Sequence, residues 1–134
     1  MAQAALKKNR PKFLSLTALL FQIRLPLAGW VSILHRASGA LLFAAVLWLL
    51  FLLDRSLASE QSFAGMQHYA SLPLVKLALL VIVWAFCHHL CAGIRFLFLD
   101  LHWGVEKAAA WRTSLAVLAV SLALTAFFGW KLVW

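Results

Sequence analysis

Three long apolar runs constrain this chain more than any other feature of its sequence. They cover about residues 31–53, 72–99 and 114–134. Each reaches the roughly 20 apolar residues that a helix needs to cross a bilayer. Lipid offers no hydrogen-bond partner to an unpaired backbone group, so such segments span membranes as helices. The sequence therefore predicts an all-α membrane protein with three spanning helices, in a single domain of 134 residues.

A shorter apolar patch, residues 13–23, precedes the first run and is flanked by Lys12 and Arg24. It is too short to span a bilayer, so we expect an interfacial helix or extended segment there. Residues 1–29 as a whole are predicted to form a cytoplasmic or interfacial arm. The most polar segment, residues 54–71, is predicted to be a connector between the first two spans.

The chain is strongly basic, with 12 Lys and Arg against 4 Asp and Glu and a formal net charge of +8. In a soluble protein this balance would suggest a nucleic-acid partner, but here the positive-inside rule accounts for it. Basic residues gather before the first run and between the second and third, so both segments are expected in the cytoplasm. A bacterial inner-membrane location follows, with a cytoplasmic N-terminus and a periplasmic C-terminus.

Three spanning helices form a thin bundle with little interior. Polar groups inside a membrane rarely face lipid, and this chain carries several within its apolar runs. We therefore expect those groups to face a partner subunit or a cofactor, which makes the chain one part of a larger assembly.

The second run contains a histidine pair, His88 and His89. A histidine in an apolar helix either hydrogen-bonds a neighbour or ligates haem iron or another metal. Gly93 lies four residues after His89 and on the same helix face, where a missing side chain permits close approach of a flat macrocycle or another helix. The spacing alone leaves both interpretations open.

Arg95 is the second unusual group in this run, because an intramembrane arginine is costly without an anion. A haem propionate, a partner carboxylate or a lipid phosphate would serve equally well. The side chain also lies only five residues before Asp100, so it could instead extend to the interface.

The first run begins with a polar patch of Ser32, His35 and Arg36, spaced three and four residues apart on one helix face. At 1.5 Å per residue this patch lies about one turn closer to the cytoplasm than His89. It suits a porphyrin with its propionates toward Arg36 and His35, or a quinone head group hydrogen-bonded by Ser32 and Arg36. A helix start whose polar side chains merely reach the interface is the remaining interpretation.

Cys87 and Cys91 also lie in the second run and are interpreted as buried thiols rather than half of a zinc site. No Cys-x-x-Cys-His sequence is present, so covalent haem attachment is not supported.

Two motifs, in order and with three spans, resemble the cytochrome b membrane-anchor subunit of succinate dehydrogenase, respiratory complex II. The first is Ser-x-x-His-Arg-x-Ser/Thr, present as Ser32-Ile-Leu-His-Arg-Ala-Ser38, and it follows an arm containing Arg10-Pro11. The second is His-x-x-x-Gly-Ile/Leu-Arg ending in Asp, present as His89-Leu-Cys-Ala-Gly-Ile-Arg-Phe-Leu-Phe-Leu-Asp100. The resemblance covers nearly the whole chain.

The resemblance implies that His89 is an axial ligand of haem b, with the second axial histidine supplied by a small membrane-anchor subunit. It implies that Ser32 and Arg36 line a ubiquinone pocket beside the iron–sulfur subunit. His35, Arg36 and Arg95 are then expected at the haem propionates, and His88 occupies a position that is not a ligand.

The sequence departs from the family pattern at three positions. Lys12 stands where an apolar residue is usual, Leu99 where an aromatic residue or Met is usual, and His102 where Gly is common. The third departure affects the loop after Asp100, where Gly104 offers a positive φ angle in its place.

The function predicted from these features is that of a redox subunit. It attaches a flavoprotein and an iron–sulfur subunit to the membrane, binds haem b with a partner, and helps to form the site of ubiquinone reduction. The chain carries no complete active site of its own. The alternatives are the corresponding anchor of a fumarate reductase and a haem-free membrane assembly protein.

Overall fold

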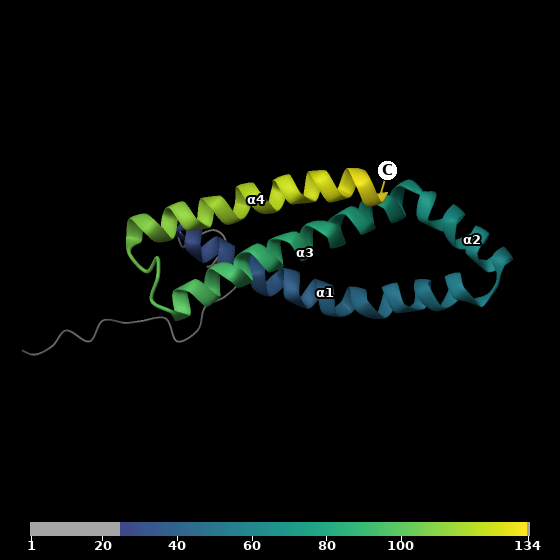
Figure 1. Cartoon of the computed structure of the whole chain (residues 1–134), viewed down its shortest axis with the longest axis horizontal. Helices are drawn as coiled ribbons and strands as arrows, with labels where there is room; N and C mark the ends of the chain where they lie inside the picture. Colours follow the sequence, from purple (N-terminus) through teal and green to yellow (C-terminus); the bar gives the residue numbers. More distant parts are fainter. Residues whose placement is uncertain (1–24, 134) are drawn as a thin grey trace, which may run out of the picture.

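The computed structural model describes residues 25–133, and this part of the chain is built from four helices (Figure 1). They are α1 (Leu27–Ala58), α2 (Glu60–Ser71), α3 (Pro73–Asp100) and α4 (Lys107–Val133). Helices α1, α3 and α4 are long and apolar enough to cross a membrane, whereas α2 is not among the candidate spans. The predicted all-α fold with three spanning helices is confirmed. The interfacial segment expected at residues 13–23 lies outside the described residues.

The spanning helices are longer than the apolar runs. Helix α1 has 32 residues, which at 1.5 Å per residue is about 48 Å and exceeds a hydrocarbon core of about 30 Å. Helix α4 begins at Lys107, ahead of the run expected from residue 114. Helical hydrogen bonds continue into the interface because the flanking residues, such as Ala108–Ala110, also favour helix.

The segment predicted to connect the first two spans, residues 54–71, consists of the end of α1 and the 12-residue helix α2. Ser59 is extended at φ −168° and separates α2 from α1, and its hydroxyl accepts a hydrogen bond from the Ser62 backbone N–H at 3.1 Å. Glu60 in the first turn complements the positive end of the helix. Pro73 then opens α3, where its missing N–H costs nothing.

Helix α3 is central and packs against both α1 and α4 (Figure 1). The core between the three is made of small side chains, with Val31, Ala92 and Val117 buried together. Ser114 and Ser121 are fully buried, and each hydroxyl donates to a carbonyl of its own helix. Small residues of this kind let helix backbones approach closely within a membrane.

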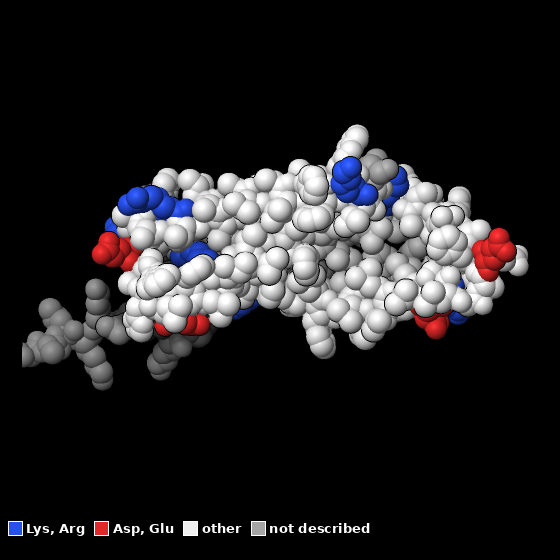
Figure 2. Space-filling model, viewed as in Figure 1, with Lys and Arg blue, Asp and Glu red and all other residues white. Residues whose placement is uncertain are grey.

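On the face that Figure 2 shows, charged side chains lie at the end where α1 begins, near α2 and beside the C-terminus of α4, and the surface between these groups is uncharged. Large apolar side chains of the long helices, such as Phe43 (79% exposed) and Leu97 (67%), face outward. A surface of this composition fits lipid or other membrane subunits. We call the end where α1 begins, α3 ends and α4 begins the turn end of the bundle.

The turn between α3 and α4 uses two residues with positive φ, His102 at 62° and Gly104 at 81°. The positive φ predicted for Gly104 is confirmed. His102 occupies the left-handed region at a cost of roughly 1–2 kcal/mol for a residue with a side chain. Gly would adopt the same backbone at position 102 without this cost.

Candidate functional site

His35 of α1 and His89 of α3 lie face to face where the two helices cross. Their ring centroids are 4.1 Å apart and the ring planes differ by 12°. Phe96, also from α3, packs against His35, with ring centroids 5.0 Å apart and ring planes at 48°. Two residues that are 54 positions apart in the sequence therefore form one site.

The Nδ1 atom of His89 makes hydrogen bonds that assign a role to each ring nitrogen. It lies 3.0 Å from the His35 carbonyl oxygen and 3.2 Å from the Ser38 hydroxyl oxygen. The Ser38 hydroxyl itself donates to the same carbonyl at 2.9 Å. A carbonyl oxygen can only accept, so Nδ1 carries the hydrogen and Nε2 of the neutral ring carries the lone pair. Nε2 is therefore the atom of His89 that is able to ligate a metal.

Two glycines permit this close helix crossing. A Cβ on Gly39 would lie 2.8 Å from Cε1 of His89, closer than real Cβ contacts allow. A Cβ on Gly93 would lie 3.6 Å from Nε2 of His35. Each histidine thus lies over a glycine of the facing helix. The expectation that Gly93 shares the face of His89 is confirmed, and what approaches it is the side chain of His35.

Ser32 lies about one turn nearer the start of α1 than His35 and contacts the Arg36 side chain. The Arg36 side chain folds back along the helix, with Nε donating to the Ser32 carbonyl and Nη2 to the Ser32 hydroxyl, both at 3.3 Å. Arg36 is exposed and Ser32 is half-buried. Because the Ser32 oxygen accepts from Arg36, its own hydrogen remains available to a further acceptor.

His88 lies in a different environment from its neighbour. Its side chain is fully buried, and its ring stacks on Trp84 with centroids 5.6 Å apart. Within residues 25–133, neither ring nitrogen of His88 has a hydrogen-bond partner. His88 is thus enclosed by the bundle, whereas His89 is only partly buried.

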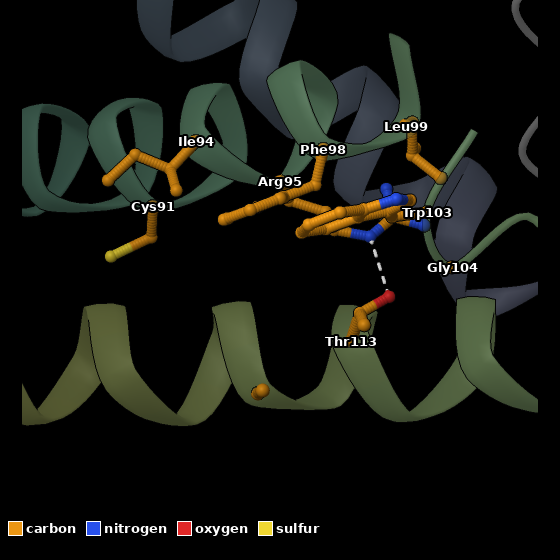
Figure 3. A pocket seen from close by; sticks show the side chains of 9 residues that line it. Cys91, Ile94, Arg95, Phe98, Leu99, Trp103, Gly104 and Thr113 are labelled. Atoms are coloured by element: carbon orange, nitrogen blue, oxygen red, sulfur yellow. Dashed lines mark hydrogen bonds between the residues drawn. The ribbon is translucent and has the colours of Figure 1, made fainter. Parts of the chain in front are cut away.

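Arg95 lies away from the histidine pair. Its Nε donates to the Thr113 hydroxyl of α4 at 3.0 Å, and the two side chains face each other across a cavity (Figure 3). Six residues separate Arg95 from His89, which at 3.6 residues per turn is roughly 120° around α3. His89 therefore faces α1 and Arg95 faces α4.

The family model of the succinate dehydrogenase/fumarate reductase transmembrane subunit matches residues 7–128. The chain belongs to this family. Its members span the membrane as subunits of an enzyme complex, which agrees with the three long apolar helices.

Curated relatives in this family are succinate dehydrogenase cytochrome b556 subunits. The protein from Paracoccus denitrificans is 35% identical over 101 residues, which cover 75% of this chain and 78% of the relative. The protein from Rickettsia felis is 34% identical over 76% of this chain and 79% of its own length. That from Coxiella burnetii is 39% identical over 69% and 72% respectively.

Within this family member, the structure brings together most of the residues singled out by the two motifs. His35 and His89 are in contact, and Ser32 and Arg36 are adjacent on the same helix. Arg95 lies apart, facing α4. No role was predicted for Ser38 or Gly39, although both lie within four residues of His35; the Ser38 hydroxyl lies 3.2 Å from Nδ1 of His89, and the His89 ring fills the space beside Gly39.

Proposed function

We propose that this chain is a haem b-binding membrane-anchor subunit of succinate:ubiquinone oxidoreductase. It attaches the catalytic subunits to the membrane and forms part of the site where ubiquinone is reduced. The cytochrome b556 names of the relatives support the haem. The observation that carries the proposal is the hydrogen bond from His89 Nδ1 to the His35 carbonyl.

The hydrogen bond acts on His89 in two ways. It holds the imidazole in the tautomer whose Nε2 lone pair is free, and it fixes the ring plane against Gly39. Histidine ligands of metals commonly donate their other ring N–H to a carbonyl or carboxylate in this manner. The residues present therefore fit an axial histidine, which we assign to His89 and not to the enclosed His88.

Haem b, when bound, supplies a one-electron redox centre whose potential depends on its ligands and surroundings. A second histidine ligand would come from a small membrane-anchor subunit, because His35 is already stacked against His89 and His88 is enclosed. We propose that His35 and Arg36 lie near the propionates, where a cationic and a neutral donor suit carboxylates. The propionate contact expected of Arg95 stays a prediction.

Ser32 and Arg36 are proposed to bind the ubiquinone head group. The Ser32 hydroxyl hydrogen and the N–H groups of Arg36 that do not bond Ser32 are donors, and a quinone carbonyl is an acceptor. Reduction places negative charge on that oxygen, so a guanidinium donor binds it more strongly as electrons arrive. Electrons would come from succinate through the flavoprotein and iron–sulfur subunits.

We further propose that the turn end of the bundle faces the cytoplasm of a bacterium and that the C-terminus faces the periplasm. The arm of residues 1–24 carries five basic residues and joins α1 at this end. The catalytic subunits would therefore dock there, next to Ser32 and Arg36. An anchor of a fumarate reductase is the alternative within the same family.

Purification of the chain with its membrane partners tests the proposal directly. We expect protein identification to find a flavoprotein, an iron–sulfur protein and a second small membrane subunit. A reduced-minus-oxidised spectrum should show the α band of a b-type haem. A complex without this band would be a haem-free anchor, and the proposal would fail.

Replacement of Gly39 by alanine tests the packing under His89. The new Cβ would lie 2.8 Å from the imidazole, which its Nδ1 hydrogen bond prevents from turning freely. We expect a smaller or shifted α band and a loss of roughly 1–3 kcal/mol of stability, as overpacking commonly costs.

The matched control is Gly65→Ala in α2, where a Cβ meets nothing within 4 Å. Alanine is favoured over glycine in a helix by about 1 kcal/mol, so Gly65→Ala should leave the band intact and stabilise slightly. Haem content per complex and thermal loss of the band are the measurements. An intact band at normal stability in Gly39→Ala would show that the ring has room to move.

A further inference from the structure

Arg95 is the only buried arginine in residues 25–133, with 8% of its surface exposed. Its hydrogen bond to Thr113 uses Nε alone, and its guanidinium carbon lies 5.7 Å from the Phe96 ring centroid. Among the described residues it has no hydrogen bond to a carboxylate. Burying a charged side chain in a membrane helix without an acidic partner is energetically unfavourable. An anion from outside this chain would offset that cost.

Arg95 lines a cavity of about 310 Å³ between the last turns of α3, the first turns of α4 and the turn that joins them (Figure 3). On the side toward the membrane centre the cavity is bordered by Cys91 and Ile94, and Phe98 lies nearer the turn, where its ring stacks on that of Trp103 with centroids 5.9 Å apart. On the side toward the turn it is bordered by Trp103 and Gly104. The cavity therefore places apolar walls next to a cationic group. An amphiphilic ligand would contact the cation with its head group and the apolar walls with its tail.

We propose that this cavity binds an anionic phospholipid, with its phosphate on the Arg95 guanidinium and the start of an acyl chain along Ile94 and Phe98. Arginine binds phosphate well because its donors match the spacing of the phosphate oxygens. Trp103 is 65% exposed and lies in the turn that follows α3, where an interfacial tryptophan is expected.

The exposed charges around the cavity do not favour an anion by themselves, so the buried arginine decides the sign of the site. Lys107 and Arg112 are exposed on the first turns of α4, while Asp100 and Glu106 are exposed nearby. These four cancel, and Arg95 supplies the net charge. A partner carboxylate would also satisfy Arg95, but it would leave the apolar wall of Cys91, Ile94 and Phe98 without an occupant. The lipid site lies on the α4 side of α3, away from His89, Ser32 and Arg36, and a phosphate there would take the place of the propionate contact predicted for Arg95.

The test is a titration of the delipidated complex with phosphatidylglycerol in mixed micelles, with a galactolipid that lacks phosphate as the comparison. We expect phosphatidylglycerol to bind the wild-type complex and raise its thermal stability, and the galactolipid to do neither. Arg95→Gln should weaken phosphatidylglycerol binding roughly ten- to a hundred-fold, the usual effect of losing charge-assisted hydrogen bonds. Arg95→Lys should fall between the two.

Arg112→Gln is the matched control, because it removes an exposed arginine one residue before Thr113 and should change binding less than threefold. The proposal is overturned if Arg95→Gln binds phosphatidylglycerol as tightly as the wild type, or if the galactolipid binds equally well. A changed midpoint potential of the haem with unchanged lipid binding would assign Arg95 to a propionate. Should Arg95→Gln fail to assemble, the two lipids added to the wild-type complex still decide.

Discussion

Replacing His89 by alanine is expected to abolish the α band of the b-type haem in the purified complex. The imidazole Nε2 is the only ligand atom that we assign to this chain, and its removal leaves the iron with the partner's histidine alone. The Nδ1 hydrogen bond to the His35 carbonyl orients the ring for this role. The measurement is a reduced-minus-oxidised spectrum, normalised to the flavin content of the complex. Added imidazole should partly restore the band, since it can occupy the space left by the side chain.

The matched control for this prediction is His88→Leu, at the adjacent position of the same helix. His88 is fully buried and has no hydrogen-bond partner within the described residues. An apolar side chain of similar size removes two unsatisfied polar atoms, so the complex should stay assembled and keep its band. An intact band in His89→Ala together with its loss in His88→Leu would reverse our ligand assignment.

The number and place of the spanning helices could be predicted from the sequence, because a run of apolar residues has few stable alternatives in lipid. Helix α2 could not be predicted in the same way. Its composition is that of a loop, and it forms because Ser59 caps it and Pro73 limits where α3 can begin. The capping serine and the proline were visible in the sequence, but they indicate a helix less strongly than the polar composition of the segment indicates a loop.

The site was predictable as far as helical spacing reaches. Spacing placed Gly93 on the face of His89, and the structure confirms this, with both residues directed at α1. Spacing cannot say which helix occupies each side of α3. The separation of Arg95 from His89 and the enclosure of His88 follow from the positions of α1 and α4, which only packing decides.

The depths of side chains along the bundle were predicted less accurately than the helix faces on which they lie. The prediction placed the patch of Ser32, His35 and Arg36 about one turn closer to the cytoplasm than His89. In the structure His35 stacks directly on His89, and only Ser32 lies a turn nearer the start of α1, where the Arg36 side chain folds back to it. The glycine pair lets the two helices approach until the rings touch, and helix lengths alone do not reveal such an approach.

Replacing Arg36 by leucine is expected to impair electron transfer from succinate to ubiquinone while sparing succinate oxidation by an artificial dye. Arg36 donates to the Ser32 carbonyl and hydroxyl and is otherwise exposed at the turn end. Its loss removes a charge-assisted donor to the quinone and frees the Ser32 hydroxyl to turn elsewhere. Such donors contribute about 1.5–3 kcal/mol, so kcat/KM for ubiquinone should fall roughly ten- to a hundred-fold.

Arg55→Leu is the matched control for Arg36→Leu, because it makes the same change at the opposite end of α1. Arg55 lies over the Phe51 ring at 5.5 Å and far from Ser32 along the helix. It should leave both assays unchanged. An equal fall of both activities in Arg36→Leu would point to failed assembly rather than to a lost quinone contact. Arg36→Lys separates the effect of charge from the effect of geometry. Lysine keeps a cation near the propionates, but it cannot bond both oxygens of Ser32 as the planar guanidinium does. The haem midpoint potential should therefore stay at the wild-type value while ubiquinone turnover falls.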